Sequence, residues 1–184
     1  MLETSLHEPG NAAETSAPRL LLASAGDVPF IVEAIVAESR LGHFSCDCAR
    51  PDVLRGLWHQ IQSIVTDGAA PMPGSRNGAA ARAFVMQVGQ ANAGFAILVE
   101  HAPGGWHRRL ELFALATQPA YRGRGLARSM VRNLVRDADS AVVHARCSRA
   151  SVGMVALLGS CGFDAMAADG DGVVVLESHQ SDRC

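Results

Sequence analysis

The chain contains no lysine, and all 16 of its basic residues are arginines, in a sequence of 184 residues with a formal net charge of −2. Without a Gly-Lys-Ser/Thr sequence there is no nucleotide-binding P-loop, and no GxGxxG stretch follows a first predicted strand, which argues against a Rossmann dinucleotide site. The slightly acidic balance provides no bulk electrostatic attraction to nucleic acid. We therefore expect no nucleic-acid partner.

Long apolar runs are also lacking. None reaches the roughly 18 residues that a membrane-spanning helix needs, and residues 1–10 have neither the basic nor the apolar region of a secretory signal. These absences predict a cytoplasmic protein with no membrane partner. Residues 1–18 are rich in small and polar residues without periodicity, so we expect a mobile tail there and a single domain over residues 19–180.

Cysteine patterns that would indicate a disulfide framework or a zinc site are missing. The five cysteines are odd in number and contain no CxxC pair. Cys46 and Cys48 are separated by one residue, which is a weak metal hint, but no partner motif accompanies them. We expect reduced thiols and no metal.

The hydrophobic pattern that is present predicts alternating strands and helices. The expected order is β-α-α-β-β-β-α-β-α-β-β, with a breaker-rich linker at residues 67–81. Strands are expected at residues 19–24, 82–88, 94–100, 110–117, 141–147, from 163, and at 173–177; helices are expected at residues 27–42, from 51 to the linker, 126–137 and 150–160.

An Arg/Gly loop lies between the predicted strand 110–117 and the helix that begins at Leu126. Its residues are Arg122, Gly123, Arg124, Gly125, Leu126 and Ala127. Backbone N–H groups at a helix N-terminus have no intrahelical partner, and the helix dipole adds partial positive charge. The glycines leave room for a ligand, and the two arginines supply bidentate donors. The segment therefore predicts a phosphate site, with a solvated turn as the alternative.

This loop resembles the Gln/Arg-x-x-Gly-x-Gly/Ala signature of the GNAT (GCN5-related N-acetyltransferase) superfamily. The preceding residues 115–121 resemble that family's strand end, and Cys161-Gly162-Phe163 resembles its later Gly-Phe. The resemblance implies an α/β (α+β) fold with a mixed, mostly antiparallel central sheet of about seven strands flanked by about four helices. It also implies that the fourth and fifth strands splay apart and that acetyl-CoA, the expected co-substrate, lies between them.

By the same resemblance, backbone groups of Leu115, Ala116 and Thr117 would bind the pantetheine arm, and one of their N–H groups would polarise the thioester carbonyl. The N–H groups of residues 122–127 would hold the pyrophosphate. Ser151 stands where many relatives have an asparagine that contacts the cofactor, and it remains able to form a hydrogen bond.

Glu111 lies six residues before Thr117, where some members of the family carry a catalytic glutamate. We expect it to act as the general base that removes a proton from the acceptor amine. The alternative is a solvent-facing carboxylate or one paired with an arginine. His43 and Phe44 follow the first predicted helix, in the region that borders the acceptor pocket of the family, so we expect them to contact the substrate; an exposed loop histidine is the alternative.

The pattern departs from the family at Leu158, where many relatives carry a tyrosine that reprotonates the thiolate. Cys161 and Ser160 lie nearby as substitutes, and water is a third. The expected function is transfer of an acetyl group to an amine of a small molecule or peptide. Two alternatives stay open: a GNAT-like module that binds CoA without turnover, and an effector or toxin that acetylates a macromolecule. The resemblance also leaves room for a homodimer formed through the late strands.

Overall fold

The computed structural model describes residues 17–44, 47–70, 78–101, 108–168 and 172–179. The strands are β1 (Arg19–Leu22), β2 (Ala69–Ala70), β3 (Ala79–Val88), β4 (Ala91–His101), β5 (Arg109–Thr117), β6 (Val142–Cys147), β7 (Phe163–Ala168) and β8 (Val174–Ser178). The helices are α1 (Val28–Ser39), α2 (Pro51–Asp67), α3 (Leu126–Asp137) and α4 (Val152–Gly159), with 3-10 turns at Ala25–Asp27 and Pro119–Tyr121. The predicted order of elements is confirmed, with the short β2 added.

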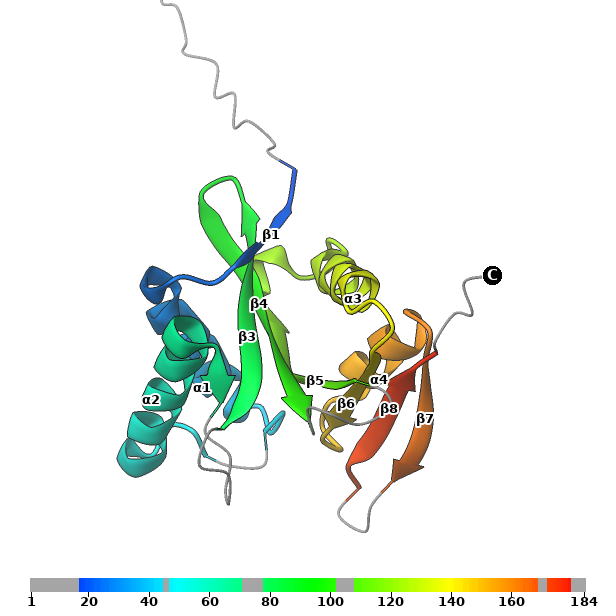
Figure 1. The fold of residues 1–184 in the computed structure, drawn as a ribbon. Helices are drawn as coiled ribbons and strands as arrows, with labels where there is room; N and C mark the ends of the chain where they lie inside the picture. The colour runs from blue at the N-terminus through cyan, green and yellow to red at the C-terminus, as the bar shows by residue number, and fades with distance from the viewer. Residues whose placement is uncertain (1–16, 45–46, 71–77, 102–107, 169–171, 180–184) are drawn as a thin grey trace, which may run out of the picture.

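The strands form one sheet in the order β1-β3-β4-β5-β6-β8-β7, and β2 pairs with β3 (Figure 1). Among the described residues, β5 and β6 form a parallel pair, and the other strand pairs are antiparallel. The mixed, mostly antiparallel α/β fold with four helices is therefore confirmed.

The β5–β6 pair separates soon after it begins. Residues 109–111 pair with residues 142–144, and no pairing continues beyond Glu111 and His144. Farther along, residues 144–147 of β6 pair with β8. The predicted splay is thus present, and it leaves the last six residues of β5 with an open edge.

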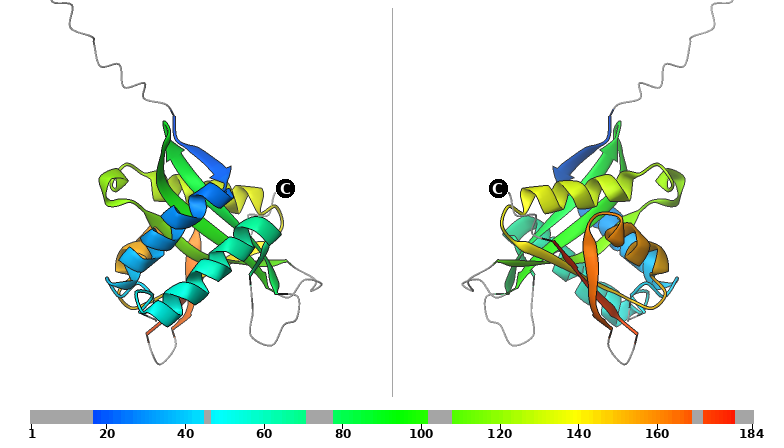
Figure 2. Two further views of the ribbon diagram at one scale, coloured as in Figure 1. Left: turned by 90° about the vertical axis from the view of Figure 1, so that its left-hand side faces the viewer. Right: turned by 90° about the vertical axis from the view of Figure 1, so that its right-hand side faces the viewer.

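Helices cover both faces of the sheet (Figure 2). Helices α1 and α2 pack on one face against a core that includes Ile31, Ile61 and Phe95, each fully buried. Helices α3 and α4 contribute to the core of the other face, where Val131 and Leu158 are buried. Truncation of a large buried side chain costs about 2–5 kcal/mol of folding stability. Packing in these two cores therefore stabilises the sheet on both faces and holds the splayed strands in place.

The α2 helix begins with Pro51 at its first turn and ends at Asp67, followed by Gly68 in the left-handed conformation (φ 67°). This is the usual helix ending at a glycine. Two parts of the predicted 67–81 linker are therefore ordered: β2, and the first residues of β3, which begins at Ala79 rather than at Arg82. Residues 71–77 lie outside the described residues.

Asp27 immediately precedes α1, but its side chain makes no capping hydrogen bond to the helix. The carboxylate of Asp27 instead accepts hydrogen bonds from the backbone N–H of Ser24 (2.8 Å), the Ser24 hydroxyl (2.7 Å) and the Asn92 side chain (2.7 Å). Burial alone would raise the pKa of Asp27, but these hydrogen bonds outweigh it and lower the pKa. Asp27 therefore ties the start of α1 to the β3–β4 hairpin.

Two further predictions concern the ends of the chain and membranes. Most of the expected tail, residues 1–16, lies outside the described residues. Within the described ranges, no helix combines the length and apolar character needed to span a membrane.

Candidate active site

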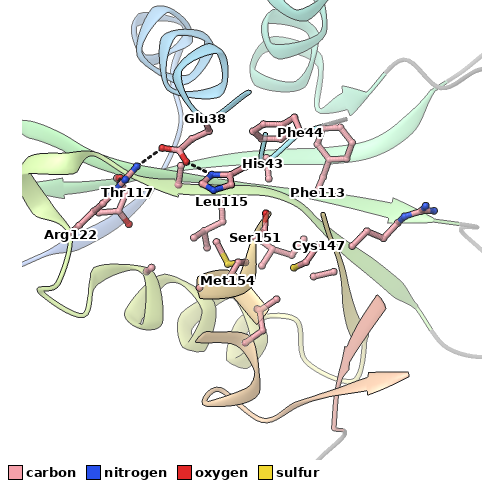
Figure 3. Close-up of a pocket in the computed structure, with 18 residues that line it drawn as sticks. Glu38, His43, Phe44, Phe113, Leu115, Thr117, Arg122, Cys147, Ser151 and Met154 are labelled. Carbon is pink, nitrogen blue, oxygen red and sulfur yellow. Dashed lines mark hydrogen bonds and ion pairs between the residues drawn. The ribbon is translucent and has the colours of Figure 1, made fainter. Parts of the chain in front are cut away.

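Two adjoining cavities lie along the open edge of β5. One, of about 350 Å³, is lined by β5, β6, the segment after α1, and α4 (Figure 3). The other, of about 310 Å³, is lined by the Arg/Gly loop and the first turn of α3. Thr117, Arg122 and Ala127 line both cavities. The end of β5 is therefore the point at which the two cavities meet.

The end of β5 offers polar groups to this junction. Leu115, Ala116 and Thr117 all line the first cavity, on the strand edge that β6 has left. Alternate backbone N–H and C=O groups of such an edge have no strand partner. The hydroxyl of Thr117 is buried and has no hydrogen-bond partner among the described residues. An unpaired buried polar atom is costly, so this edge suits a ligand that carries hydrogen-bonding groups.

The Arg/Gly loop has the geometry of an anion cradle. Gly123 and Gly125 have φ angles of 74° and 76°, and a Cβ added at either glycine would meet no atom within 4 Å. The positive φ angles require glycine, and the open space leaves the backbone accessible. The amide of Ser129 makes the first α-helical hydrogen bond, to the Gly125 carbonyl. The N–H groups of the three preceding residues, including Leu126 and Ala127, are thus unpaired by the helix.

The two arginines of the loop play different parts. The guanidinium of Arg124 lies over the ring of Tyr121, 5.3 Å from its centroid, which holds that side chain against the loop. Arg122 turns inward, where its Nε donates to the Thr117 carbonyl (3.0 Å) and its other end pairs with Glu38. All of the predicted residues of the Arg/Gly loop except Arg124 therefore line one cavity, and their backbone geometry would fit an anionic group such as a pyrophosphate.

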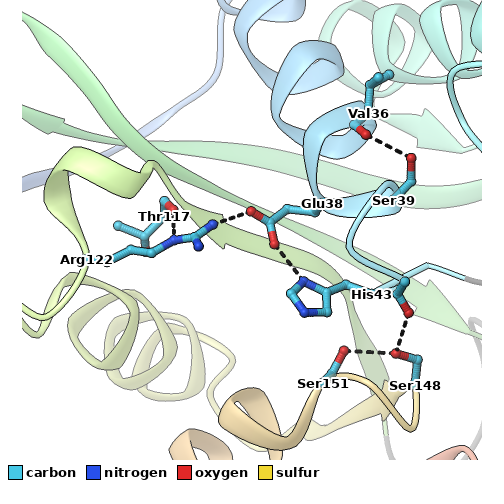
Figure 4. Close-up of polar contacts among 9 residues, drawn as sticks. Val36, Glu38, Ser39, His43, Thr117, Arg122, Ser148 and Ser151 are labelled. Carbon is cyan, nitrogen blue, oxygen red and sulfur yellow. Dashed lines mark hydrogen bonds and ion pairs between the residues drawn. The ribbon is translucent and has the colours of Figure 1, made fainter.

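The far wall of the first cavity carries a carboxylate–imidazole pair (Figure 4). His43 Nδ1 lies 2.7 Å from Glu38 Oε2, and the other Glu38 oxygen pairs with Arg122. The Glu38 side chain is only 13% exposed. Phe44 lines the same cavity, so both residues predicted to contact the substrate lie at it. Glu38 links them to the Arg/Gly loop through its pair with Arg122.

A second link closes the cavity from the other side. The Ser148 hydroxyl donates to the Gly42 carbonyl (3.1 Å) and lies 3.0 Å from the Ser151 hydroxyl. Ser151 also lines the cavity, at the start of α4. The end of α1 and the start of the segment after it are therefore tied to the Arg/Gly loop through Glu38 and Arg122, and to the loop before α4 through Gly42 and Ser148.

Glu111 lies outside the lining of both cavities. Its Oε2 is 2.5 Å from His101 Nε2, and its side chain is 13% exposed. The carboxylate therefore pairs with a histidine rather than with an arginine. It lies one residue before Leu112 and two before Phe113, both of which line the first cavity.

None of the three positions considered for a general acid, Leu158, Ser160 and Cys161, offers a proton donor to the first cavity. Leu158 lines the first cavity and is fully buried, and its side chain cannot donate a proton. The Ser160 hydroxyl donates to the Leu157 carbonyl (2.7 Å), and neither Ser160 nor Cys161 lines a cavity described above. Cys147 does line the first cavity, but burial raises the pKa of its thiol to about 11. It is therefore protonated at neutral pH, and a protonated thiol is a poor nucleophile.

Solved structures share this fold at low sequence identity. An acetyltransferase from Thermus thermophilus is 16% identical, with a TM-score of 0.65 over 89% of this chain and 97% of that one. Spermidine N-acetyltransferase from Vibrio cholerae, in complex with CoA and spermine, is 17% identical, with a TM-score of 0.62 over 87% and 92%. AAC(6')-Ib, in complex with ribostamycin and coenzyme A, is 15% identical, with a TM-score of 0.65 over 91% and 98%.

No curated protein is significantly similar to the chain in sequence. The sequence profile of the acetyltransferase (GNAT) family, however, matches residues 54–163, which is more than half of the chain. The match runs from α2 to the first residue of β7 and contains the splayed strands and the Arg/Gly loop. The chain therefore belongs to the acetyltransferase (GNAT) family, a family of acyltransferase enzymes.

Proposed function

We propose that the protein transfers an acetyl group from acetyl-CoA to an amine of a small molecule or peptide. The observation that carries this proposal is the meeting of two cavities at the end of β5, one beside an anion cradle and one beside Glu38 and His43. The structural neighbours named above include enzymes solved with spermine and with ribostamycin, both of which carry amines. A small-molecule amine is therefore the first acceptor class to test.

Each part of the site has a separate task in this proposal. Residues 122–127 hold the pyrophosphate through backbone N–H groups, and the edge formed by Leu115, Ala116 and Thr117 orients the pantetheine arm, with Ser151 at the opposite wall. Acetyl-CoA supplies the acetyl group already activated as a thioester. A backbone N–H of the β5 edge donates to the thioester carbonyl oxygen, where negative charge develops as the amine nitrogen attacks.

The acceptor amine is held by the wall that carries Glu38, His43 and Phe44. The paired carboxylate attracts a cationic amine, and the aromatic ring packs against its carbon atoms. Glu111 is the general base, and it reaches the amine proton through a water at the mouth of the β5–β6 gap. The new C–N bond forms as the C–S bond breaks, and solvent returns a proton to the leaving thiolate because Leu158 cannot.

The first test is calorimetric titration of acetyl-CoA into the wild type and into Gly125→Glu, which places a negative charge in the proposed cradle. Gly89→Glu is the matched control, because Gly89 also has a positive φ and open space around its Cβ position, but lies in the β3–β4 turn. We expect binding in the wild type and the control, and none in Gly125→Glu. A folded wild type that fails to bind acetyl-CoA would contradict the proposal.

The second test is turnover. Release of the CoA thiol is followed with a panel of polyamines, aminoglycosides and peptide amines. Leu158 at the usual acid position favours one other function, a module that binds CoA without turnover. Binding of acetyl-CoA with no acetylation of any amine would support that module. The homodimer and the cytoplasmic location stay predictions, for which gel filtration with light scattering and cell fractionation are the measurements.

A further inference from the structure

A cluster of two histidines and a glutamate lies on the sheet beside the first cavity. His101, Glu111 and His144 come from the neighbouring strands β4, β5 and β6. Each offers one metal-ligating atom, and these atoms all lie within 4.8 Å of one another. The cluster is half-buried, and none of its members lines the cavity that holds Glu38 and His43.

Strand register brings the three side chains together. Glu111 stands opposite Val99 on one side and opposite His144 on the other, and His101 lies two residues beyond Val99. Residues directly paired across strands, and residues two apart along a strand, point to the same face of a sheet. All three side chains therefore leave the sheet in one direction, from a backbone fixed by hydrogen bonds rather than from a loop.

The donors have the chemistry of a transition-metal site. His101 Nε2 already lies 2.5 Å from Glu111 Oε2, and the His101 and His144 rings lie 5.5 Å apart between centroids. The buried Nδ1 of His144 has no hydrogen-bond partner among the described residues. Arg109, two residues before Glu111 on β5, is paired with Glu177. The Glu111 carboxylate thus brings negative charge to the cluster, which favours a cation.

We propose that His101, Glu111 and His144 bind one divalent first-row transition-metal ion, with Zn²⁺ as the ion to test. Two imidazoles and one carboxylate form a zinc donor set that leaves a fourth position open to water or another ligand. In a tetrahedral site with bonds of about 2.0–2.2 Å, ligand atoms lie roughly 3.3 Å apart. Side-chain rotation would have to widen the 2.5 Å separation between His101 and Glu111 and shorten the longer separations, which reach at most 4.8 Å, with no change in strand register.

An ion at this position would occupy the carboxylate that the proposed function assigns as the general base. Metal binding and acetyl transfer would then compete for Glu111. The metal proposal itself does not rest on the proposed function, since binding is measured without acetyl-CoA. Turnover is therefore measured on the metal-free protein, so that a failure of acetyl transfer and a failure of metal binding are observed separately.

The test is calorimetric titration of Zn²⁺ into untagged, chelator-treated and dialysed protein. We expect one equivalent to bind, and His101→Asn, Glu111→Gln and His144→Gln each to weaken binding by at least about 10- to 100-fold, since loss of an outer-shell partner alone has that effect. His59→Gln is the matched histidine control, because His59 is exposed on α2. Cys147→Ser and Cys161→Ser control for thiol ligands, and each of these control variants should retain the site.

Further measurements distinguish loss of the metal site from loss of the fold. Circular dichroism reports the fold of each variant, and Zn²⁺ should raise the Tm of the wild type but not of the three ligand variants. Co²⁺ added in place of Zn²⁺ should give the visible absorption bands of a tetrahedral site in the wild type but not in the ligand variants. No binding of Zn²⁺ to the wild type, or one equivalent that persists in folded forms of all three ligand variants, would overturn the proposal.

Discussion

Two carboxylate–imidazole pairs lie near the open edge of β5, and they are built differently. In one, His43 Nδ1 lies 2.7 Å from Glu38 Oε2; in the other, His101 Nε2 lies 2.5 Å from Glu111 Oε2. Both carboxylate side chains are 13% exposed. The Glu38 pair comes from the end of α1 and the segment after it, and lines the first cavity. The Glu111 pair comes from the adjacent strands β4 and β5, and it does not line the first cavity.

The difference shows what holds each pair in place. Backbone hydrogen bonds between β4 and β5 fix the Glu111 pair, and its position does not depend on the cofactor loop. The Glu38 pair depends on tertiary contacts: Arg122 connects it to the Arg/Gly loop, and Ser148 connects the segment after α1 to the loop before α4. We therefore expect changes at Glu111 to alter kcat, and changes around Glu38 to alter the KM of the acceptor.

The largest effect is expected from Glu111→Gln. Loss of a general base should lower kcat by about 10²- to 10⁴-fold and leave the acceptor KM nearly unchanged. Steady-state kinetics with varied acceptor is the measurement. Glu100→Gln is the control, because Glu100 lies on β4 and pairs with Arg108. A Glu111→Gln enzyme with a kcat close to that of the wild type would move the base to the Glu38 pair.

A smaller effect, on the acceptor KM, is expected from Glu38→Gln. The substitution removes the charge that pairs with both Arg122 and His43, and a charge-assisted hydrogen bond is worth about 1.5–3 kcal/mol, so KM should rise roughly tenfold or more. Steady-state kinetics with varied acceptor is the measurement. Glu33→Gln, at an exposed position on α1, is the control.

The double variant Glu38→Gln/Arg122→Gln sharpens the same point. If the ion pair couples the acceptor wall to the cofactor loop, the two single changes should not add in their effects on KM and on acetyl-CoA affinity. Additive effects would show that the two cavities act independently, which would contradict the coupling inferred from the structure.

A still smaller effect is expected from Ser148→Ala, which removes the hydrogen bond to the Gly42 carbonyl. A neutral hydrogen bond contributes about 0.5–1.5 kcal/mol, so the acceptor KM should rise by roughly two- to tenfold. Ser160→Ala is the matched control, since the Ser160 hydroxyl bonds to its own helix. An unchanged KM in Ser148→Ala would mean that Arg122 alone holds the segment.

The smallest effect is expected from Cys147→Ser, although Cys147 lies in the first cavity. Because the thiol has a pKa of about 11, it is protonated at neutral pH and should take no part in direct transfer. We expect kcat within a few-fold of the wild type and no burst of CoA release in rapid-mixing experiments. A loss of more than 100-fold in the folded variant, together with such a burst in the wild type, would indicate an acyl-enzyme route instead.

The bulge in β5 explains why the position of Glu111 could not be predicted from the sequence. Strict alternation places Glu111 on the same face as Phe113, Leu115 and Thr117. The register shift between Ile97 and Leu98 of β4 leaves Phe113 unpaired on β5. That extra residue reverses the alternation.

The consequence is visible in the packing of the strand. Glu111 stands opposite Val99, and Ala114 stands opposite Ile97. Val99, Ala114 and Ile97 belong to the same core, on the face of the sheet that α1 and α2 cover. Glu111 therefore shares its face with Ala114 rather than with Leu115, which packs against the opposite core. The bulge depends on pairing with another strand, and the local sequence of β5 does not specify it.

The sequence by itself determined the geometry of the Arg/Gly loop, because that geometry depends on a contiguous segment: two glycines with positive φ, the arginines beside them, and the start of a helix. It also determined the order of the elements, which follows from local hydrophobic periodicity. Only the tertiary structure decided that Glu38 joins Arg122, and that His101, Glu111 and His144 form one cluster. These contacts join residues distant in sequence or on separate strands, so strand register and helix packing fix them.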